Sequence, residues 1–307
     1  MEQQLAESRG PIADPPLVSI ITPSLNQGPF IKATIQSVLE QDYSNIEYLV
    51  MDGGSTDKTL DILHNYGDRL QWVSEPDRGQ TDAVNRGIRR TRGEIIGWLN
   101  SDDLYAPGAI STAVNAFSAD PDLMLVYGDA YWIAGDGRKI APCISVEPFN
   151  LNRLLFYANF IVQPAAFFRR TAVESVGGLD DSLNYVMDYD LWIRLTKRYR
   201  AAYIDQVLAL VRDYPETKTS TGGSQRMREM AQMINRHGGR GLPAYYQLEQ
   251  MGMLATEALA ALGRMQVGQS LSCAVRACEG LLAARVVRTL LSPRTWQIIR
   301  TRRLRSG

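Results

Sequence analysis

Apolar and polar residues follow one another in short blocks along the chain, and the blocks have the lengths and periods of strands and helices. Residues 17–22 and 46–51 are rich in β-branched and aliphatic side chains, which predicts two buried strands. Between them, over 30–41, apolar residues recur at helical spacing. Strand, helix and strand in this order predict a right-handed parallel crossover.

The same alternation continues along the chain beyond this first crossover. Further strands are predicted at 70–74, 95–99, 123–127, 163–170 and 203–211, and helices at 58–66, 80–90, 107–117, 171–176 and 187–195. Turn residues and short apolar runs between 131 and 150 predict a hairpin and an irregular crossing. We therefore expect an α/β fold with a doubly wound, mostly parallel central sheet flanked by helices.

The composition changes after residue 222. Met- and Ala-rich helical segments begin there, and residues 225–307 hold 13 arginines and four glutamates with no lysine or aspartate. We expect a flexible leader at 1–16, an α/β domain at 17–222 and a helical, basic C-terminal region at 223–307. That region either contacts a membrane surface peripherally or packs on the α/β domain and ends in a solvated tail, and the sequence leaves both open.

The overall composition excludes several classes of protein. Apolar residues make up 45% of the 307 and charged residues 21%, which is an ordinary globular balance. The three cysteines are too few and too irregularly spaced for a disulfide framework or a zinc site. A secretory signal is absent from the N-terminal residues, and no apolar run reaches the roughly 18 residues of a membrane span. We expect a cytoplasmic protein, peripheral at the inner face of the membrane if it contacts one, and no nucleic-acid partner.

Two adjacent acids follow a predicted strand that is a short, nearly unbroken apolar run. Strand 95–99 runs directly into Asp102 and Asp103, so both carboxylates belong at the carboxyl end of a buried strand. Neighbouring anions are costly there unless a cation neutralises them, and Mg²⁺ and Mn²⁺ bind carboxylates together with substrate phosphates. The sequence favours a divalent metal site that holds a diphosphate, and a solvated Asp pair that caps the next turn is the alternative.

Two further strands also end in acids. Asp52 follows strand 46–51, and Glu75 and Asp77 follow strand 70–74. Because the carboxyl ends of neighbouring parallel strands share one edge of a sheet, we expect these acids to meet Asp102 and Asp103 in one crevice. The alternative is that they are loop acids that face water.

Several segments of the chain, over roughly residues 17–222, resemble the family 2 glycosyltransferases, which have the GT-A fold. The segments are VSIITPSLNQ, YLVMDGGSTDKT, SEPDRGQTDAVNRGI, GWLNSDD and GGLDDSLNYVMDYDLWIRL. The resemblance implies an inverting transfer of a sugar from a nucleoside diphosphate, UDP or dTDP, to an acceptor hydroxyl. It also implies a glycan or lipid-linked acceptor and a role in cell-surface polysaccharide or glycan synthesis.

The resemblance assigns a binding role to most of these acids and to the loop after the first strand. The implied nucleotide-sugar contacts are Thr22, Pro23, Asn26, Asp52, Asp57, Asp77, Arg78 and Asp102. Asp102 and Asp103 correspond to the metal motif of the family, here Ser-Asp-Asp in place of Asp-x-Asp, which implies Mn²⁺ or Mg²⁺ as cofactor.

The same resemblance places the catalytic base at Asp188. Relatives often have Glu-Asp at this point, whereas Met187 precedes Asp188 here, and this makes Asp190 a rival. A carboxylate that removes the acceptor proton contributes about 10²- to 10⁴-fold to such a reaction. The structural alternative is an acid that only stabilises a helix N-terminus. Lys218 is a further candidate, as a contact to the diphosphate.

Other readings of the chain remain open at this point. A sugar-1-phosphate nucleotidyltransferase also uses an α/β sheet and a metal, but opens with a Gly-rich loop where this chain has PSLNQG. The hypothesis that does not involve an enzyme is a protein that binds nucleotide sugars without turnover. The residues predicted to be structural are His64, His237, Trp98 and Trp192.

Overall fold

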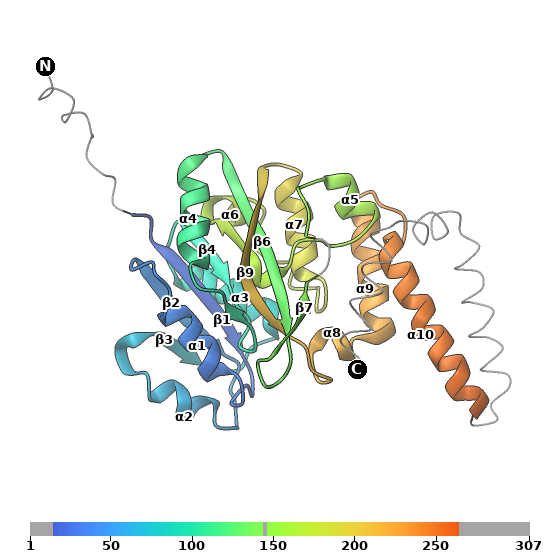
Figure 1. Cartoon of the computed structure of the whole chain (residues 1–307), viewed down its shortest axis with the longest axis horizontal. Helices are drawn as coiled ribbons and strands as arrows, with labels where there is room; N and C mark the ends of the chain where they lie inside the picture. Colours follow the sequence, from blue (N-terminus) through green and yellow to red (C-terminus); the bar gives the residue numbers. More distant parts are fainter. Residues whose placement is uncertain (1–14, 144–145, 264–307) are drawn as a thin grey trace, which may run out of the picture.

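A computed structural model describes residues 15–143 and 146–263 of the chain, with side chains to residue 256. Its centre is a nine-stranded sheet with helices on both faces (Figure 1), in the order β3-β2-β1-β4-β8-β6-β9-β5, with β7 paired to β6. The strands are β1 (Val18–Ser24), β2 (Ile46–Asp52), β3 (Gln71–Ser74), β4 (Ile95–Trp98), β5 (Leu104–Tyr105), β6 (Leu123–Ile133), β7 (Lys139–Pro142), β8 (Ala166–Arg169) and β9 (Arg200–Arg212).

Ten α-helices lie within the described residues. They are α1 (Ile31–Leu39), α2 (Thr59–His64), α3 (Gln80–Arg90), α4 (Ala109–Ala119), α5 (Leu151–Phe156), α6 (Arg170–Ser175), α7 (Met187–Thr196), α8 (Lys218–Thr221), α9 (Gly223–Arg236) and α10 (Ala244–Gly263). The predicted strands and helices are confirmed, with ends that shift by a few residues, and the predicted hairpin is formed by β6 and β7.

The sheet has a parallel half and a mixed half. The strands β3, β2, β1 and β4 pair in parallel, which is the predicted crossover arrangement. Beyond them, β8 runs antiparallel between β4 and β6, and the long β6 pairs in parallel with β9. Most paired residues therefore lie in parallel ladders, and the carboxyl ends of β1, β2, β3 and β4 share one edge.

The sheet is buried on both faces, so consecutive side chains of its central strands enter different cores. Ile20 and Ile95 belong to the core beneath α1 and α4, whereas Ile21 and Ile96 belong to the core beneath α3 and α7. All four side chains are fully buried. This explains why β4 is an unbroken apolar run and has no alternation of polar and apolar residues.

The methionine-rich helix α9 packs into the core that also contains α7. Its residues Met227, Met230 and Met233 are buried in one cluster with Trp192. No helix of the described part is long and apolar enough to cross a membrane. The predicted leader up to residue 14 and the basic stretch 264–307 lie outside the described residues.

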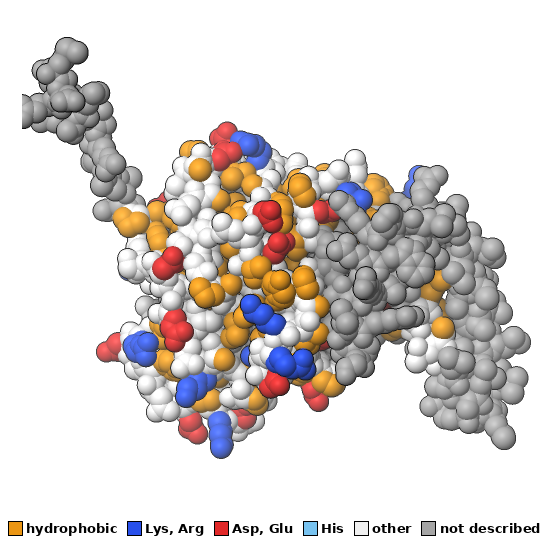
Figure 2. Space-filling model, in the orientation of Figure 1, with side chains coloured by type: hydrophobic (Ala, Val, Ile, Leu, Met, Phe, Trp, Pro, Cys, Tyr) orange, Lys and Arg blue, Asp and Glu red, His pale blue; other side chains and the backbone are white. Residues whose placement is uncertain are grey.

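Charged side chains of both signs are interspersed on the face of the molecule shown in Figure 2. Two carboxylates of the predicted site differ from these surface charges, because Asp52 and Asp103 are buried. Their positions are therefore fixed by hydrogen bonds to neighbouring residues inside the protein.

Two helical glycines test how closely α3 lies against the sheet. A Cβ at Gly87 would come 2.5 Å from Ile21 Cγ2, whereas a Cβ at Gly252 in α10 would meet no atom within 4 Å. Both Gly→Ala changes gain about 1 kcal/mol of helix propensity. We expect Gly87→Ala to lower the free energy of unfolding by about 1–3 kcal/mol through overpacking, and Gly252→Ala to leave it equal or higher. Urea denaturation of both variants measures the difference, and equal effects would refute the close contact.

Candidate active site

One cavity of about 1150 Å³ opens where the carboxyl ends of the parallel strands meet. Residues from the end of β1, the loop after β4, the end of β9, the start of α7, and α8, α9 and α10 line it. It brings together six of the residues singled out from the sequence: Pro23, Asp77, Asp102, Asp103, Asp188 and Lys218. The acids that follow β3 and β4 and the acid at the start of α7 therefore lie in one cavity, as expected.

The loops after β1 and β2 are bound to each other by hydrogen bonds. Gly53 N donates to Ser24 O at 2.8 Å, and Thr56 N donates to Asn26 Oδ1 at 2.8 Å. Gly28 N donates to Asp57 Oδ2 at 2.9 Å. The side chains of Asn26 and Asp57 therefore join the two loops, and neither residue lines the cavity.

Asp52 is buried and its carboxylate is used within the protein. Its oxygens accept hydrogen bonds from the Gly54 and Ser55 amides and from the hydroxyls of Ser55 and Ser74, at 2.5–3.1 Å. Thr22 is buried too, with its hydroxyl 3.3 Å from that of Tyr48. Neither residue lines the cavity, and Asp52 fixes the loop after β2 through these hydrogen bonds.

Asp77 lines the cavity, and Arg78 next to it does not. Asp77 Oδ1 accepts a hydrogen bond from Gly79 N at 2.8 Å, and a Cβ at Gly53 would come 2.8 Å from Asp77 Oδ2. The Arg78 side chain is 73% exposed and pairs with Asp82 and Asp181. The absence of a side chain at residue 53 thus leaves space for the Asp77 carboxylate in this position.

The acids Asp102 and Asp103 are held by the end of β9. Arg212 N donates to Asp103 Oδ1 at 2.9 Å, and the Tyr214 hydroxyl donates to Asp102 Oδ2 at 2.9 Å. Burial raises the pKa of both carboxyls, and the charge of Asp102 raises the pKa of Asp103 further. The Arg212 guanidinium, fixed by three backbone carbonyls, opposes both shifts.

The donor chemistry of this acid pair fits a hard divalent cation. Two adjacent carboxylates at a cavity wall offer oxygen ligands, and Mg²⁺ or Mn²⁺ completes its shell with waters and substrate phosphates. The described residues contain no group of three or more His, Cys, Asp or Glu side chains arranged for a metal. A metal at Asp102 and Asp103 would therefore depend on the substrate for further ligands.

The two acids of α7 have opposite environments. Asp188 lines the cavity, and burial raises its pKa to about 6, against the weaker effects of nearby Lys218 and Asn159. Asp190 accepts hydrogen bonds from His237 Nε2 at 2.8 Å and Arg194 Nε at 2.6 Å. Burial acts to raise the pKa of Asp190, but these two partners outweigh it and hold that pKa below its usual value. Asp190 and His237 thus tie α7 to α9.

A chain of polar side chains connects Lys218 with the acid pair. Lys218 Nζ donates to Gln80 Oε1 at 3.1 Å, and Gln80 Nε2 donates to Asn100 Oδ1 at 2.7 Å. Asn100 Nδ2 donates in turn to Asp103 Oδ2 at 3.2 Å. Burial lowers the pKa of Lys218, while the charges of Glu229 and Asp188 act in the opposite direction.

Sequence reasoning missed several of these residues, including Gln80, Asn100, Arg212 and Tyr214. Only Asn100, which directly precedes the acid motif, carried a signal that could have revealed it. The predicted structural role of Trp98 and Trp192 agrees with their burial at 1% and 0% exposure. Trp98 also lines the cavity.

Comparison with known proteins agrees with this geometry. The family model described as glycosyl transferase family 2 matches residues 19–177. An uncharacterized glycosyltransferase of Rickettsia typhi is 32% identical over 222 residues, which is 68% of each chain. Chondroitin synthase of Escherichia coli is 30% identical over 185 residues, 59% of this chain and 27% of that protein.

Solved structures share the fold at lower identity. S. aureus TarS in complex with UDP-GlcNAc has a TM-score of 0.57 and 16% identity, over 78% of this chain and 72% of that chain. The mannosyltransferase PcManGT from Pyrobaculum calidifontis, in complex with GDP-Man and Mn²⁺, has a TM-score of 0.59 and 23% identity, over 94% of this chain and 85% of that chain. The sequence match and the shared architecture lead to one conclusion: the chain belongs to glycosyltransferase family 2 and has the GT-A fold.

Proposed function

We propose that this glycosyltransferase moves a sugar from a UDP- or dTDP-linked donor to an acceptor hydroxyl, with inversion at the anomeric carbon. One observation carries the proposal: the acid pair Asp102 and Asp103 and the isolated acid Asp188 line the same cavity from different elements. A protein that only bound nucleotide sugars would need the pair for the diphosphate and would have no use for Asp188.

The donor base and ribose belong at the end of the cavity formed by the loops after β1 and β3. Asp77 offers a carboxylate oxygen there, which can accept a hydrogen bond from a uracil or thymine imide or from a ribose hydroxyl. The mutual hydrogen bonds of the loops, with Asp52 and Asp57 inside them, keep this end in one shape. A preformed pocket lowers the entropy cost of binding.

The diphosphate belongs beside Asp102, Asp103 and Lys218. Mn²⁺ or Mg²⁺ on the two carboxylates would supply a positive charge that stabilises the departing diphosphate. Lys218 lies on the same cavity and adds a second positive charge. Arg212 keeps the acid pair in place from behind through its amide and its guanidinium.

Asp188 is assigned the role of general base. The acceptor oxygen forms a bond to the anomeric carbon as the bond from that carbon to the diphosphate oxygen breaks, and the acceptor proton passes to Asp188. A single displacement of this kind inverts the configuration. The raised pKa of about 6 still leaves Asp188 mostly ionised at neutral pH, and it makes Asp188 a stronger base than an ordinary aspartate.

The acceptor belongs at the other end of the cavity, beside α9 and α10. Tyr185, Tyr245, Tyr246 and Met253 line this end. The volume of about 1150 Å³ exceeds the range of about 300–1,000 Å³ for a pocket that holds one ligand. Aromatic walls suit sugar rings, and we infer a glycan or lipid-linked acceptor of cell-surface polysaccharide synthesis, used in the cytoplasm at the inner membrane face.

The base assignment predicts the effect of Asp188→Asn. The amide keeps the shape of the side chain and cannot take a proton, so we expect transfer to fall by about 10²- to 10⁴-fold. Binding of the donor should change little. Donor turnover with Mn²⁺ and isothermal titration with UDP measure the two effects, with Asp61→Asn on exposed α2 as the control. Full turnover by Asp188→Asn would remove this residue from the reaction.

The pKa of Asp188 predicts the acid limb of the pH profile. A base acts only when ionised, so kcat/KM should fall about tenfold for each pH unit below about 6 and level off above it. Steady-state rates between pH 4.5 and 8 measure the limb. An apparent pKa near that of an ordinary exposed aspartate would contradict the assignment.

The metal assignment predicts that nucleotide binding depends on Mn²⁺ and on Asp102. A saturating ligand at 100 times its Kd stabilises the folded state by about 2.7 kcal/mol. We expect UDP or dTDP to raise the Tm of the protein with Mn²⁺ and not with EDTA, and Asp102→Asn to abolish the increase. Thermal-shift measurements with UDP, dTDP and GDP also identify the donor base. An equal increase in EDTA would refute the metal role.

A further inference from the structure

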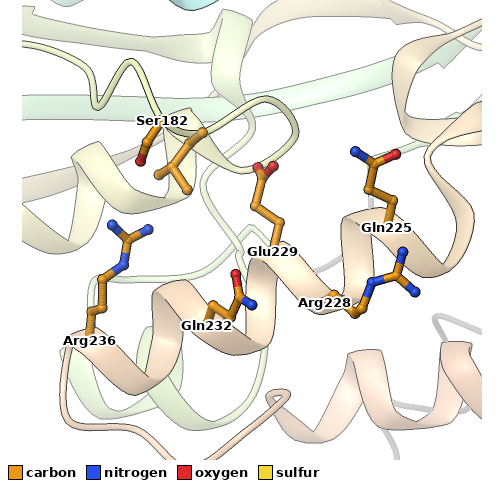
Figure 3. Close-up of a pocket in the computed structure, with 7 residues that line it drawn as sticks. Ser182, Gln225, Arg228, Glu229, Gln232 and Arg236 are labelled. Carbon is orange, nitrogen blue, oxygen red and sulfur yellow. The ribbon is translucent and has the colours of Figure 1, made fainter.

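The last three residues before α7 all donate their amides to one carboxylate of another helix. Glu229 Oε1, on α9, accepts hydrogen bonds from the amides of Asn184, Tyr185 and Val186 at 3.0, 2.6 and 3.0 Å. Figure 3 shows the Glu229 side chain extending from its helix toward the loop that carries Ser182. The three amides end two residues before Asp188, the proposed base.

These contacts hold the N-cap residue of α7 and the two residues before it, at a helix start that has no side-chain cap of its own. The first amides of a helix have no partner within the helix, and a side chain at the N-cap usually accepts from them. The N-cap of α7 is Val186, which makes no such bond. Glu229 accepts instead from the amide of Val186 and from the two amides before it, and its negative charge lies at the positive end of the α7 dipole.

The other side of the same loop is attached to α3. Thr81 Oγ1 donates to Leu183 O at 2.9 Å, and Asn85 Nδ2 donates to Leu179 O at 2.9 Å. The first residue of α3 is Gln80, which contacts both Lys218 and Asn100 in the cavity. The loop thus lies between a helix that reaches the donor end of the site and the helix that carries Glu229.

We propose that Glu229 is a positioning residue, which fixes the start of α7 and thereby the place of the Asp188 carboxylate relative to the donor. The inference rests on the proposed function of Asp188. Glu229 and Asp188 both lie beyond residues 19–177, which match the family model. Asp190, bound to His237 at the end of α9, ties the same two helices together at a second point.

Glu229→Ala and Glu229→Gln together test the role. Removal of the acceptor leaves the three amides without their partner and frees the start of α7. A displacement of about 1 Å can cost about 10²-fold in rate, so we expect kcat of Glu229→Ala to fall by about 10- to 100-fold with the donor KM within about twofold. The amide oxygen of Glu229→Gln accepts from the same amides and should restore most of kcat.

A matched control comes from the same helix and the same loop. Arg236 pairs with Asp180 at 2.9 Å and is 49% exposed, so Arg236→Gln removes a contact between α9 and the loop at a distance from the start of α7. We expect this variant to keep wild-type kcat. Thermal melts of all three variants identify the fraction that is folded during each assay.

Amide hydrogen exchange separates this inference from the function on which it rests. Exchange at residues 184–186 should be slow in the wild type and in Glu229→Gln and fast in Glu229→Ala. Fast exchange in Glu229→Ala with unchanged kcat would overturn the positioning role and leave Asp188 as the base. Full turnover by Asp188→Asn would instead overturn the base, whatever the exchange shows. A lower Tm of Glu229→Ala with unchanged kcat would mean that Glu229 only stabilises the fold and would also overturn the positioning role.

Discussion

The structure depends on keeping two adjacent carboxylates at the end of a buried strand. Asp103 is 4% exposed beside Asp102, and two anions so close in a poorly hydrated place repel each other. Hydrogen bonds hold the acids and their loop in place: the Thr34 hydroxyl in α1 donates to the carbonyls of residues 101 and 103, and the Arg212 amide at the end of β9 donates to the Asp103 carboxylate. The short β5 pairs with β9 and brings the end of that strand behind the acids. A divalent cation bound to both carboxylates would relieve the repulsion that remains.

The convergence of the acids could be predicted because it follows from topology. Parallel strands present their carboxyl ends at one edge, so Asp77, Asp102 and Asp103 reach one cavity whatever their side-chain partners are. The use of each side chain could not be predicted in this way. The Asp52 carboxylate accepts four hydrogen bonds from neighbouring residues of the protein. Arg78 pairs with Asp181, which is more than a hundred residues away in the sequence. Such partners are determined by loop geometry, which residue spacing does not record.

The strand directions in the mixed half of the sheet could not be predicted from the sequence either. The apolar run of β8 is the same whether the strand is parallel or antiparallel, and only the structure shows that it inserts between β4 and β6. The two residues of β5 are too few to carry any period. The composition change after residue 222 is real in the sequence, but α9 buries its methionines in the core that contains Trp192. A methionine-rich amphipathic helix has the same pattern on either side of a domain boundary.

Asp188 and Asp190 show why environment decides the role of a carboxylate. Two residues along a helix turn the side chain by about 200°, so the two acids point to opposite sides of α7. One side is the cavity, where burial raises the pKa of Asp188 to about 6. The other side contains Arg194 and His237, which hold the pKa of Asp190 low and make it a poor proton acceptor. The sequence presents Asp188 with Asp190 as a rival, and packing makes Asp190 a structural anion and leaves Asp188 at the cavity wall, where a base is proposed.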